Sequence, residues 1–394
     1  MKTPSLDKHI VLRRNEEHRI TEGHPWVFSN EIVETRGTPV IGDVVEVLSS
    51  RRESLGTGLY NPHSLIAVRM LSSNVVTVDD VFFTQRITDA LRLRQTLYPD
   101  STAYRLVHGE SDFLPGLVID RFNDIFAVQA LSYGMDSRLP IVCDVLEALF
   151  HPIAIIERGE SPLRTLETLP LQNRILRGEV YTTEIVEHGL RYTVDVLKGQ
   201  KTGFFLDQRE NRFAIRRFSK GARVLDCFCN YGGFGLNAAA AGATEVVGID
   251  ISEEAIQKAS HNASLNELRT IRFEQADVFQ KLEELQNHGA TFDVVVLDPP
   301  SFTKNRKNVQ AARKGYRELH MKALCVTRPG GILITASCSH HIEPGVFLDI
   351  LAESAQRVDR HIQVLDWRGA APDHPILPRV PETHYLKFAI LRAI

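Results

Sequence analysis

The sequence predicts a multidomain protein with a small β-barrel at the N-terminus, a central α+β segment and a C-terminal α/β domain built on a mainly parallel sheet. Three observations support this fold class. The chain has 394 residues, more than one hydrophobic core usually serves, so two or three domains are expected. Short β-rich runs, broken by glycine and proline, fill the stretch up to residue 72. After residue 190, apolar strand-like runs alternate with amphipathic helix-like segments, which is typical of a parallel sheet.

The first predicted domain spans residues 1–74. Its apolar runs VVEVLS (44–49) and SLIAVRML (64–71) are separated by glycine- and proline-containing turns at 37–39 and 61–62. Short strands divided by such turns are typical of a small β-barrel, so we expect one here.

Residues 75–178 form the second predicted domain, of the α+β type. The run FFTQRITDALRLRQTLY (82–98) has the apolar spacing of a helix, and GLVIDRFNDIFAVQAL (116–131) alternates as strands do. The third domain is predicted over residues 179–394, where a further pair of strands leads into the alternating α/β pattern.

The composition indicates a soluble protein without a membrane-spanning segment. No apolar run approaches the roughly 18 residues that cross a bilayer, and the start MKTPSLDKHI lacks the apolar core of a signal peptide. Five cysteines are too few and too scattered for a disulfide framework. We therefore expect a cytoplasmic protein with free thiols. A net charge of −3 neither favours nor excludes a nucleic-acid partner.

The stretch RVLDCFCNYGGFG (223–235) has the pattern of a strand, a glycine-rich turn and the start of a helix. Glycines such as Gly232 let a ligand approach the backbone closely at a helix N-terminus. The glycine spacing differs from a dinucleotide fingerprint, and Asp226 at the strand's end would repel a phosphate. A ligand that carries an ammonium group therefore fits better than a pyrophosphate. Cys227 and Cys229 lack further ligands for zinc nearby and are interpreted as wall and core.

Two further strands end in acids. The strand TEVVGID ends at Asp250, whose carboxylate can accept hydrogen bonds from two ribose hydroxyls. The turn EQADVF places Asp277 where it can accept a hydrogen bond from an exocyclic adenine amine. Taken singly, each acid could instead cap a helix, and for Asp277 the two interpretations have equal weight. Acids that close three successive strands favour a nucleoside site, in which we include the neighbouring Ile251 and Val278.

The next two strands bring a carboxylate and a thiol to the same edge of the predicted sheet. FDVVVLDPPSF carries Asp298 at its carboxyl end, and GGILITASCS ends on Cys338. Because neighbouring parallel strands end at one edge, Asp298 and Cys338 are expected to face one pocket. The turn after Asp298 should form a stiff wall with an aromatic ring, against which a planar base could lie. This wall consists of Pro299, Pro300 and Phe302.

Taken in order, LDCFCNYGGFG, GID, EQADVF, LDPPSF and ITASCS resemble the class I S-adenosylmethionine-dependent methyltransferases, which have a Rossmann-like domain. The pair DPPSF and SCS is similar to the ribosomal RNA cytosine-5 methyltransferases. GHPWVFSNEI resembles the opening of a PUA RNA-binding domain, and YRLVHGESDFLPGLVIDRF and GQKTGFFLDQRENR look like segments of the same methyltransferase family. The resemblance covers nearly the whole chain. It implies S-adenosylmethionine as cofactor and 23S ribosomal RNA, free or in a pre-ribosomal particle, as partner.

The resemblance also implies roles for single residues. Phe205 and Arg209 would help to hold the cofactor. Cys338 would add as a thiolate to carbon 6 of cytosine, and Asp298 would hydrogen-bond the ring edge while charge builds there. Many RNA cytosine-5 methyltransferases have a second cysteine directly after the proline pair, whereas this sequence has Ser301. Another base would therefore have to remove the proton from carbon 5.

Two other functions stay open from the sequence alone. One is methylation of an exocyclic amine, which needs no thiol, and the other is a ribosome-assembly factor that binds RNA without catalysis. A basic loop beside the predicted pocket is either a solvated charge run or a set of phosphate contacts. The loop contributes Lys304, Arg306 and Lys307. The oligomeric state is also open, with a homodimer as one alternative.

Overall fold

The computed structural model describes residues 6–303 and 306–394. Two compact units make up the chain. The first comprises Met1–Ile185, Val194–Leu206 and Pro372–Thr383, and the second comprises Val186–Thr193, Asp207–Ala371 and His384–Ile394. Within the two described ranges, no helix is both long enough and apolar enough to cross a bilayer.

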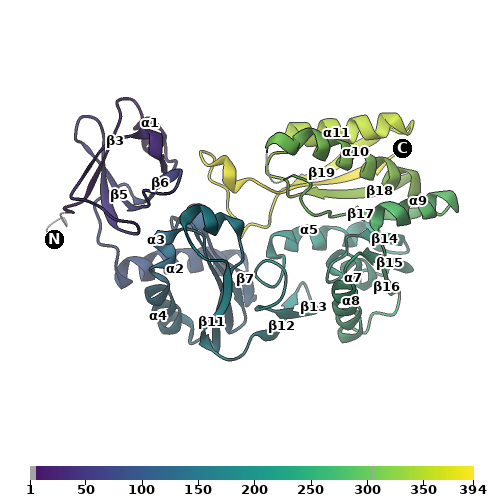
Figure 1. Cartoon of the computed structure of the whole chain (residues 1–394). Helices are drawn as coiled ribbons and strands as arrows, with labels where there is room; N and C mark the ends of the chain where they lie inside the picture. The colour runs from purple at the N-terminus through teal and green to yellow at the C-terminus, as the bar shows by residue number, and fades with distance from the viewer. Residues whose placement is uncertain (1–5, 304–305) are drawn as a thin grey trace. The chain divides into compact units, whose positions relative to one another are not determined.

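The N-terminal part of the first unit is a six-stranded mixed sheet (Figure 1). The pairing of β1 with β4 is parallel, and the pairings of the other neighbours are antiparallel. Buried apolar side chains such as Val45, Val47 and Val68 form its core, as the β-rich runs predict. A short helix, α1 (His18–Thr21), precedes the second strand. Across the sheet the strands are β2 (Trp26–Phe28), β6 (Ile66–Ser72), β5 (Ser54–Tyr60), β4 (Val44–Leu48), β1 (His9–Leu12) and β3 (Ile32–Arg36).

The central part of the first unit packs helices on a five-stranded sheet. The predicted helix is present as α2 (Asp80–Leu97), which begins where the Asp79 side chain accepts a hydrogen bond from the Phe82 amide. It packs with α4 (Leu139–Phe150) and the sheet in one core, and α3 (Tyr133–Asp136) is a single turn before α4. Across the sheet the strands are β11 (Gln172–Gly178), β10 (Ala154–Gly159), β9 (Ile125–Ala130), β8 (Leu117–Phe122) and β7 (Ala103–His108).

The hairpin β12 (Thr182–Glu187) and β13 (Leu190–Asp195) leads into the seven-stranded sheet of the second unit. The first five strands of this sheet run parallel, and β20 lies antiparallel between its neighbours. Across the sheet the strands are β16 (Ile271–Gln275), β15 (Glu245–Asp250), β14 (Arg223–Cys227), β17 (Phe292–Leu297), β18 (Thr327–Ser337), β20 (Lys387–Ala393) and β19 (Ile362–Arg368).

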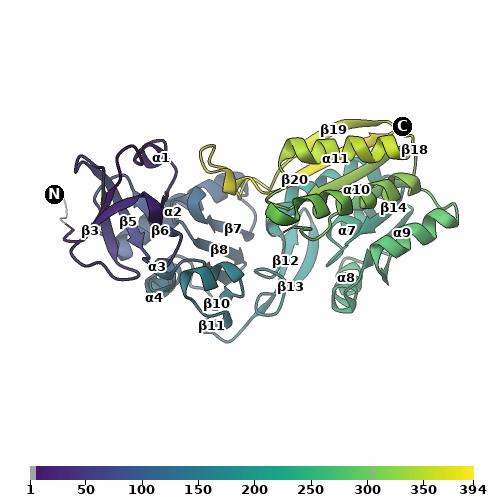
Figure 2. The ribbon, with the colours of Figure 1, turned by 45° about the horizontal axis from the view of Figure 1, so that its top comes forward.

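Helices cover both faces of this sheet (Figures 1 and 2). Along β17, Val294 and Val296 join one core, whereas Val295 and Leu297 join the other, which explains the unbroken apolar run in the sequence. One core includes α9 (Val278–Asn287), α10 (Val309–Val326) and α11 (Pro344–Arg357). The other includes α5 (Arg209–Ala214) and α7 (Gly233–Ala240). The described part of this unit also contains α6 (Arg216–Ser219) and α8 (Glu253–Leu265).

The order of strands reverses at β14, because the chain continues to β15 on one side and later returns to β17 on the other. In open α/β sheets, ligands bind outside the carboxyl ends of the strands at such a reversal. The predicted acids and the predicted thiol follow these carboxyl ends.

Candidate cofactor and catalytic site

Asp226 lies at the reversal point, near the carboxyl end of β14, and is fully buried. Its Oδ2 accepts a hydrogen bond from the Gly235 amide at 2.8 Å, while Oδ1 is buried without a hydrogen-bond partner among the described residues. Burial raises the pKa of Asp226 to about 8, and the like charges of Asp298 and Asp250 add to this shift. A buried carboxylate with one unsatisfied oxygen is suited to a cationic ligand.

The glycine turn after β14 brings the backbone close to its neighbours. Gly232 has a φ of +83° and precedes α7, and a β-carbon there would lie 2.9 Å from the Phe273 ring. Phe228 and Asn230, in the same turn, also have positive φ although neither is glycine. Such strained backbone is concentrated at functional sites, because only the surrounding structure can hold it. Gly232 thus packs directly against Phe273, and the approach of a ligand to this turn stays a prediction.

Asp250 ends β15, and backbone amides hold its carboxylate. Its Oδ2 accepts from the Asn230 amide at 3.0 Å, and its Oδ1 accepts from the Ser252 amide at 2.9 Å. The next side chain, Ile251, is 67% exposed although it is apolar. A fixed carboxylate beside an exposed apolar side chain offers acceptors for ribose hydroxyls and a surface for a base.

Asp277 caps a helix. It is the N-cap of α9, and its Oδ1 accepts a hydrogen bond from the Gln280 amide at 3.0 Å. The following residue, Val278, is buried in the core of the second unit. The helix-cap interpretation of Asp277 is thus observed, and it engages one of the two carboxylate oxygens. Its contact with the cofactor stays a prediction.

The segment that resembles the family signature contributes to both units. Phe205 lies in the first unit, half-buried, with the Lys201 Nζ 4.6 Å from the centre of its ring. Arg209 lies in the second unit, buried at the start of α5, where its Nε is 3.5 Å from Glu187 Oε2. Burial opposes ionisation of Glu187, but Arg212 and Arg209 hold its pKa below the usual value. Arg209 is therefore part of a buried ionic cluster.

Asp298 follows β17, and an amide side chain holds it. Its Oδ1 accepts a hydrogen bond from Gln208 Nε2 at 3.0 Å. The Asn211 Nδ2 donates to Gln208 Oε1 at 2.7 Å and to the Gly369 carbonyl at 3.0 Å. Gln208 and Asn211 belong to the segment GQKTGFFLDQRENR, from which the sequence prediction took only Phe205 and Arg209. The sequence contains no local signal for these two residues, because Gln208 meets Asp298 only across 90 residues of the chain.

Ser339, which directly follows Cys338, contacts groups of two other segments. The Ser339 hydroxyl lies 3.1 Å from Ser301 Oγ and 3.0 Å from the Tyr316 hydroxyl, and it accepts from the Phe302 amide at 3.2 Å. It therefore joins the turn after Asp298 to the turn at Cys338. We call the hydroxyl groups of Ser301, Tyr316 and Ser339 the hydroxyl cluster.

The hydroxyl cluster lies close to both predicted catalytic groups. Burial raises the pKa of the Tyr316 phenol to about 12, and the charges of Cys338 and Asp298 contribute to this rise. Because Cys338 and Asp298 both raise the pKa of the same buried phenol, both side chains lie near Tyr316. Cys338 itself is half-buried and packs against the apolar core between the sheet and α7.

The predicted wall has mixed exposure. Pro299 is buried and Pro300 is exposed. The Phe302 ring packs at 4.5 Å from the Tyr316 ring and 6.4 Å from the Phe279 ring, measured between centroids. Of the basic loop, Lys307 is exposed, whereas Lys304 and the side chain of Arg306 lie outside what the structure describes.

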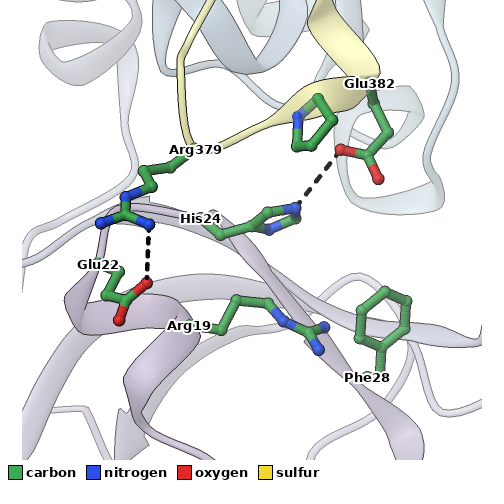
Figure 3. Close-up of a pocket in the computed structure, with 7 residues that line it drawn as sticks. Arg19, Glu22, His24, Phe28, Arg379 and Glu382 are labelled. Atoms are coloured by element: carbon green, nitrogen blue, oxygen red, sulfur yellow. Dashed lines mark ion pairs between the residues drawn. The ribbon is translucent and has the colours of Figure 1, made fainter. Parts of the chain in front are cut away.

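A separate pocket of about 410 Å³ lies in the first unit, between the N-terminal sheet domain and the segment Pro372–Thr383 (Figure 3). Two ion pairs cross it, His24 to Glu382 at 3.6 Å and Arg379 to Glu22 at 3.4 Å. Burial lowers the pKa of His24, and Glu382 partly offsets this effect. None of the predicted site residues lines this pocket, and its charged walls pair with one another.

Comparison with known families gives a match for each end of the chain. A PUA-like domain matches residues 10–73, and an S-adenosylmethionine-dependent methyltransferase domain matches residues 172–388. Among solved structures, SMU.776, a methyltransferase complexed with SAH, superposes with a TM-score of 0.84 at 20% identity, covering 98% of this chain and 99% of that one. An S-adenosylmethionine-dependent methyltransferase from Streptococcus mutans gives a TM-score of 0.83 at 19% identity, with the same coverage.

Relatives of higher identity span the full length. The ribosomal RNA large subunit methyltransferase I of Tolumonas auensis is 38% identical over 393 residues, which is 98% of this chain and 99% of the relative. That of Shewanella denitrificans is 39% identical over 391 residues, 97% of this chain and 98% of the relative. These matches confirm the predicted fold class and S-adenosylmethionine as the cofactor. The chain therefore belongs to the family of S-adenosylmethionine-dependent methyltransferases that includes the ribosomal RNA large subunit methyltransferases I.

Proposed function

We propose that this protein methylates carbon 5 of a cytosine in large-subunit ribosomal RNA through a covalent bond to Cys338. The names of its full-length relatives support the RNA class. The chemistry rests on one observation: the hydroxyl cluster joins the turn that carries Asp298 to the turn that carries Cys338. A carboxylate and a thiol held at one sheet edge are the two groups that this reaction needs.

The cofactor side of the site is built from acids of three different strands. S-adenosylmethionine, when bound, supplies a methyl group made electrophilic by a sulfonium. We assign its ammonium to Asp226, whose Oδ1 is buried without a partner in the described chain, and its ribose to Asp250. Gly232 lets the ligand approach the backbone, and Ile251 and Asp277 would flank the base. These residues fit S-adenosylmethionine because acidic and apolar side chains alternate along the carboxyl ends of β14, β15 and β16.

The steps that modify the base would use the residues at the carboxyl ends of β17 and β18. The Cys338 thiolate would bond to carbon 6 of the cytosine, which moves an electron pair onto carbon 5. Asp298, oriented by Gln208, would share a proton with N3 of the ring and accept a hydrogen bond from the exocyclic amine while this charge builds. Carbon 5 then bonds to the methyl group while the bond between that methyl and the sulfonium sulfur breaks, which would leave a neutral thioether. Carbon 5 loses its proton to a base. The bond between carbon 6 and sulfur breaks, and the ring double bond and the thiolate are restored.

The RNA partner would meet the first unit as well as the catalytic edge. The PUA-like domain at residues 10–73 is the part of the chain whose family match supports RNA binding. Exposed Lys307 follows the catalytic turn after Asp298, where a cation can neutralise a phosphate. We propose ribosomal RNA, rather than a small molecule, as the source of the target base.

The test is a covalent trap. An RNA with 5-fluorocytosine at the target position cannot lose its carbon 5 substituent after methyl transfer, so the enzyme should stay bonded through sulfur. We expect the adduct in the wild-type protein with S-adenosylmethionine, and its loss in Cys338→Ala. Cys325→Ala is the matched control, because Cys325 and Cys338 are the two thiols that are not fully buried. Mass spectrometry of the trapped peptide identifies the bonded residue.

Two results would overturn this proposal. If the wild-type enzyme methylates ordinary RNA but never forms the adduct, methylation of an exocyclic amine becomes the better assignment. If the adduct forms in Cys338→Ala but not in another cysteine variant, the reaction class holds and the nucleophile changes.

A further inference from the structure

A buried lysine lies beside the proposed nucleophile. Lys387 is the first residue of β20, and only 2% of its surface is exposed. Its Nζ donates hydrogen bonds to the carbonyl oxygens of Ser339 and Tyr385, each at 2.8 Å. Lysine is rarely buried so completely, because its ammonium must be taken out of water. A buried ammonium at the edge of a reaction site requires an explanation.

The strand pairing brings Lys387 next to Cys338. Antiparallel pairing places Lys387 opposite Ser337, the last residue of β18 before the thiol. One bond from the ammonium then reaches the carbonyl of Ser339, the residue directly after the thiol. The thiol packs against the same core as Tyr385, Leu386 and Phe388, which flank the lysine in the chain. Lys387 therefore contacts the residues on both sides of Cys338: it pairs with Ser337 in the sheet, and its ammonium binds the Ser339 carbonyl.

The two charges also act on each other. Burial lowers the pKa of Lys387 to about 8, and the charge of Cys338 opposes that shift. The lysine is consequently still mostly an ammonium at pH 7. Of the other titratable groups named near the thiol in the described ranges, none is a buried cation. Tyr316 is a neutral phenol, Asp298 adds a negative charge, and His340 and His341 follow in the chain at an exposed and a half-exposed position.

We propose that Lys387 is a positioning residue that fixes the turn around Cys338 and stabilises its thiolate by charge. This inference rests on the proposed nucleophilic role of Cys338. The lysine keeps its proton throughout the reaction: it stabilises the thiolate before addition to carbon 6 and again when the thiolate leaves. It touches neither the base nor the methyl group, so its effect passes through the cysteine.

The test measures the thiol without any RNA. Full-length wild-type protein, Lys387→Met and Lys387→Arg are treated with iodoacetamide between pH 5.5 and 9.5, and alkylation of each cysteine is followed by peptide mass spectrometry. The rate follows the thiolate fraction, which changes tenfold for each unit of pKa. We expect Cys338 to react at least about tenfold more slowly at pH 7 in Lys387→Met and to recover most of its rate in Lys387→Arg. Cys325 is the internal standard and should react equally in all three.

The same variants have a catalytic signature. Lys387→Met should lower kcat for RNA methylation at pH 7 by at least about tenfold and move the acidic limb of the pH–rate profile upward. The KM for S-adenosylmethionine should stay the same, because Lys387 lies on the other half of the edge. If Lys387 had a purely structural role, Lys387→Met would lower activity by the same factor at every pH. The alkylation of Cys338 would then be as fast in Lys387→Met and Lys387→Arg as in the wild type.

Several outcomes separate this inference from the proposed function. Unchanged alkylation of Cys338 in Lys387→Met overturns the inference, even if the covalent RNA adduct forms in the wild type. Absence of the covalent adduct overturns the proposed function. The adduct is measured with the wild-type protein and 5-fluorocytosine RNA, so its result does not depend on the Lys387 variants. If Lys387→Met does not fold, the wild-type profile decides: a midpoint for Cys338 at or above that of Cys325 overturns the inference.

Discussion

The proposed site lies along the carboxyl ends of the parallel strands, and the functional side chains in its two halves are held by different kinds of hydrogen-bond donor. In the cofactor half, at β14, β15 and β16, backbone amides bind every acid: Gly235 binds Asp226, Asn230 and Ser252 bind Asp250, and Gln280 binds Asp277. In the base half, at β17 and β18, side chains do this work. Gln208 binds Asp298 across 90 residues, and Ser301 and Ser339 meet across 38 residues.

The difference has a physical consequence. A backbone amide survives any substitution of its own side chain except proline, so most single mutations of the donor residues leave the frame of the cofactor half intact. A side-chain hydroxyl or amide is lost with one substitution, and its buried partners are then left unsatisfied. The base half should therefore be the more fragile part of the site, and three predictions test this contrast, beginning with the largest effect.

The largest effect is expected in the hydroxyl cluster. Ser339→Ala removes one oxygen that serves Ser301, Tyr316 and the Phe302 amide, so the free energy of unfolding should fall by about 3 kcal/mol. Urea unfolding measures this change. The matched control is Ser354→Ala in α11, a buried serine that donates to the backbone carbonyls of Arg317 and Ile350, for which a loss of about 1 kcal/mol is expected.

Calorimetry completes this test of the contrast. Ser339→Ala should bind S-adenosylmethionine as tightly as the wild type, because it leaves the cofactor half unchanged. Equal losses of stability in Ser339→Ala and Ser354→Ala would show that the cluster is no more critical than an ordinary buried serine.

A smaller effect is expected at the ribose position. Asp250→Ala should weaken S-adenosylmethionine binding by roughly 2 kcal/mol, because charge-assisted hydrogen bonds to two hydroxyls are lost. Isothermal calorimetry gives the affinity directly. Asp293→Ala is the control, since Asp293 lies near the start of β17 and binds the Arg223 amide and Arg328 there. Unchanged affinity in Asp250→Ala would remove this acid from the cofactor site.

The effect that is smallest per pH unit concerns Asp226. Its pKa is raised to about 8 in the folded protein, against about 3.9 in an unfolded chain, so the folded state retains a proton that the unfolded state has lost. The stability from this group is therefore fully present below about pH 4 and is lost as the pH rises towards 8. The slope is at most about 1.4 kcal/mol per pH unit.

The measurement compares stability at several pH values. Unfolding of the wild type and of Asp226→Asn is followed from pH 5 to pH 8, without cofactor. The wild type should lose stability relative to the variant over this range, because only the wild type releases the proton. Parallel curves would mean that Asp226 is already ionised at pH 5 and that its buried oxygen is stabilised in another way.

Much of the cofactor half could be predicted from the sequence, because most of its contacts join residues fewer than ten positions apart. Asp250 and Ser252 are two residues apart, and Asp277 and Gln280 are three apart, so strand ends, turns and caps are visible in short windows. The same windows could not decide whether Asp277 caps a helix or binds a base. The structure shows the cap, which uses one oxygen.

The base half was predicted only in part. Asp298 and Cys338 stand out because each ends an apolar strand, but nothing near them in the chain indicates their supporting groups. Gln208, Tyr316 and Lys387 lie 90, 22 and 49 residues from the groups they support, and each resembles an ordinary surface or core residue in its own window. Their roles depend on which strands become neighbours.

By itself, the sequence determined the periodic features of this protein: the barrel-like N-terminal strands, the helix α2, the apolar parallel strands and the acids at their ends. These follow from the spacing of apolar side chains and from turn residues, which act over a few positions. Tertiary structure alone decided how the reactive edge is supported. It placed β20 beside β18, which brought a buried ammonium to the Cys338 turn, and it placed Tyr316 of α10 against Ser339. Such contacts have no local pattern, because they arise only when strands and helices distant in the chain pack together.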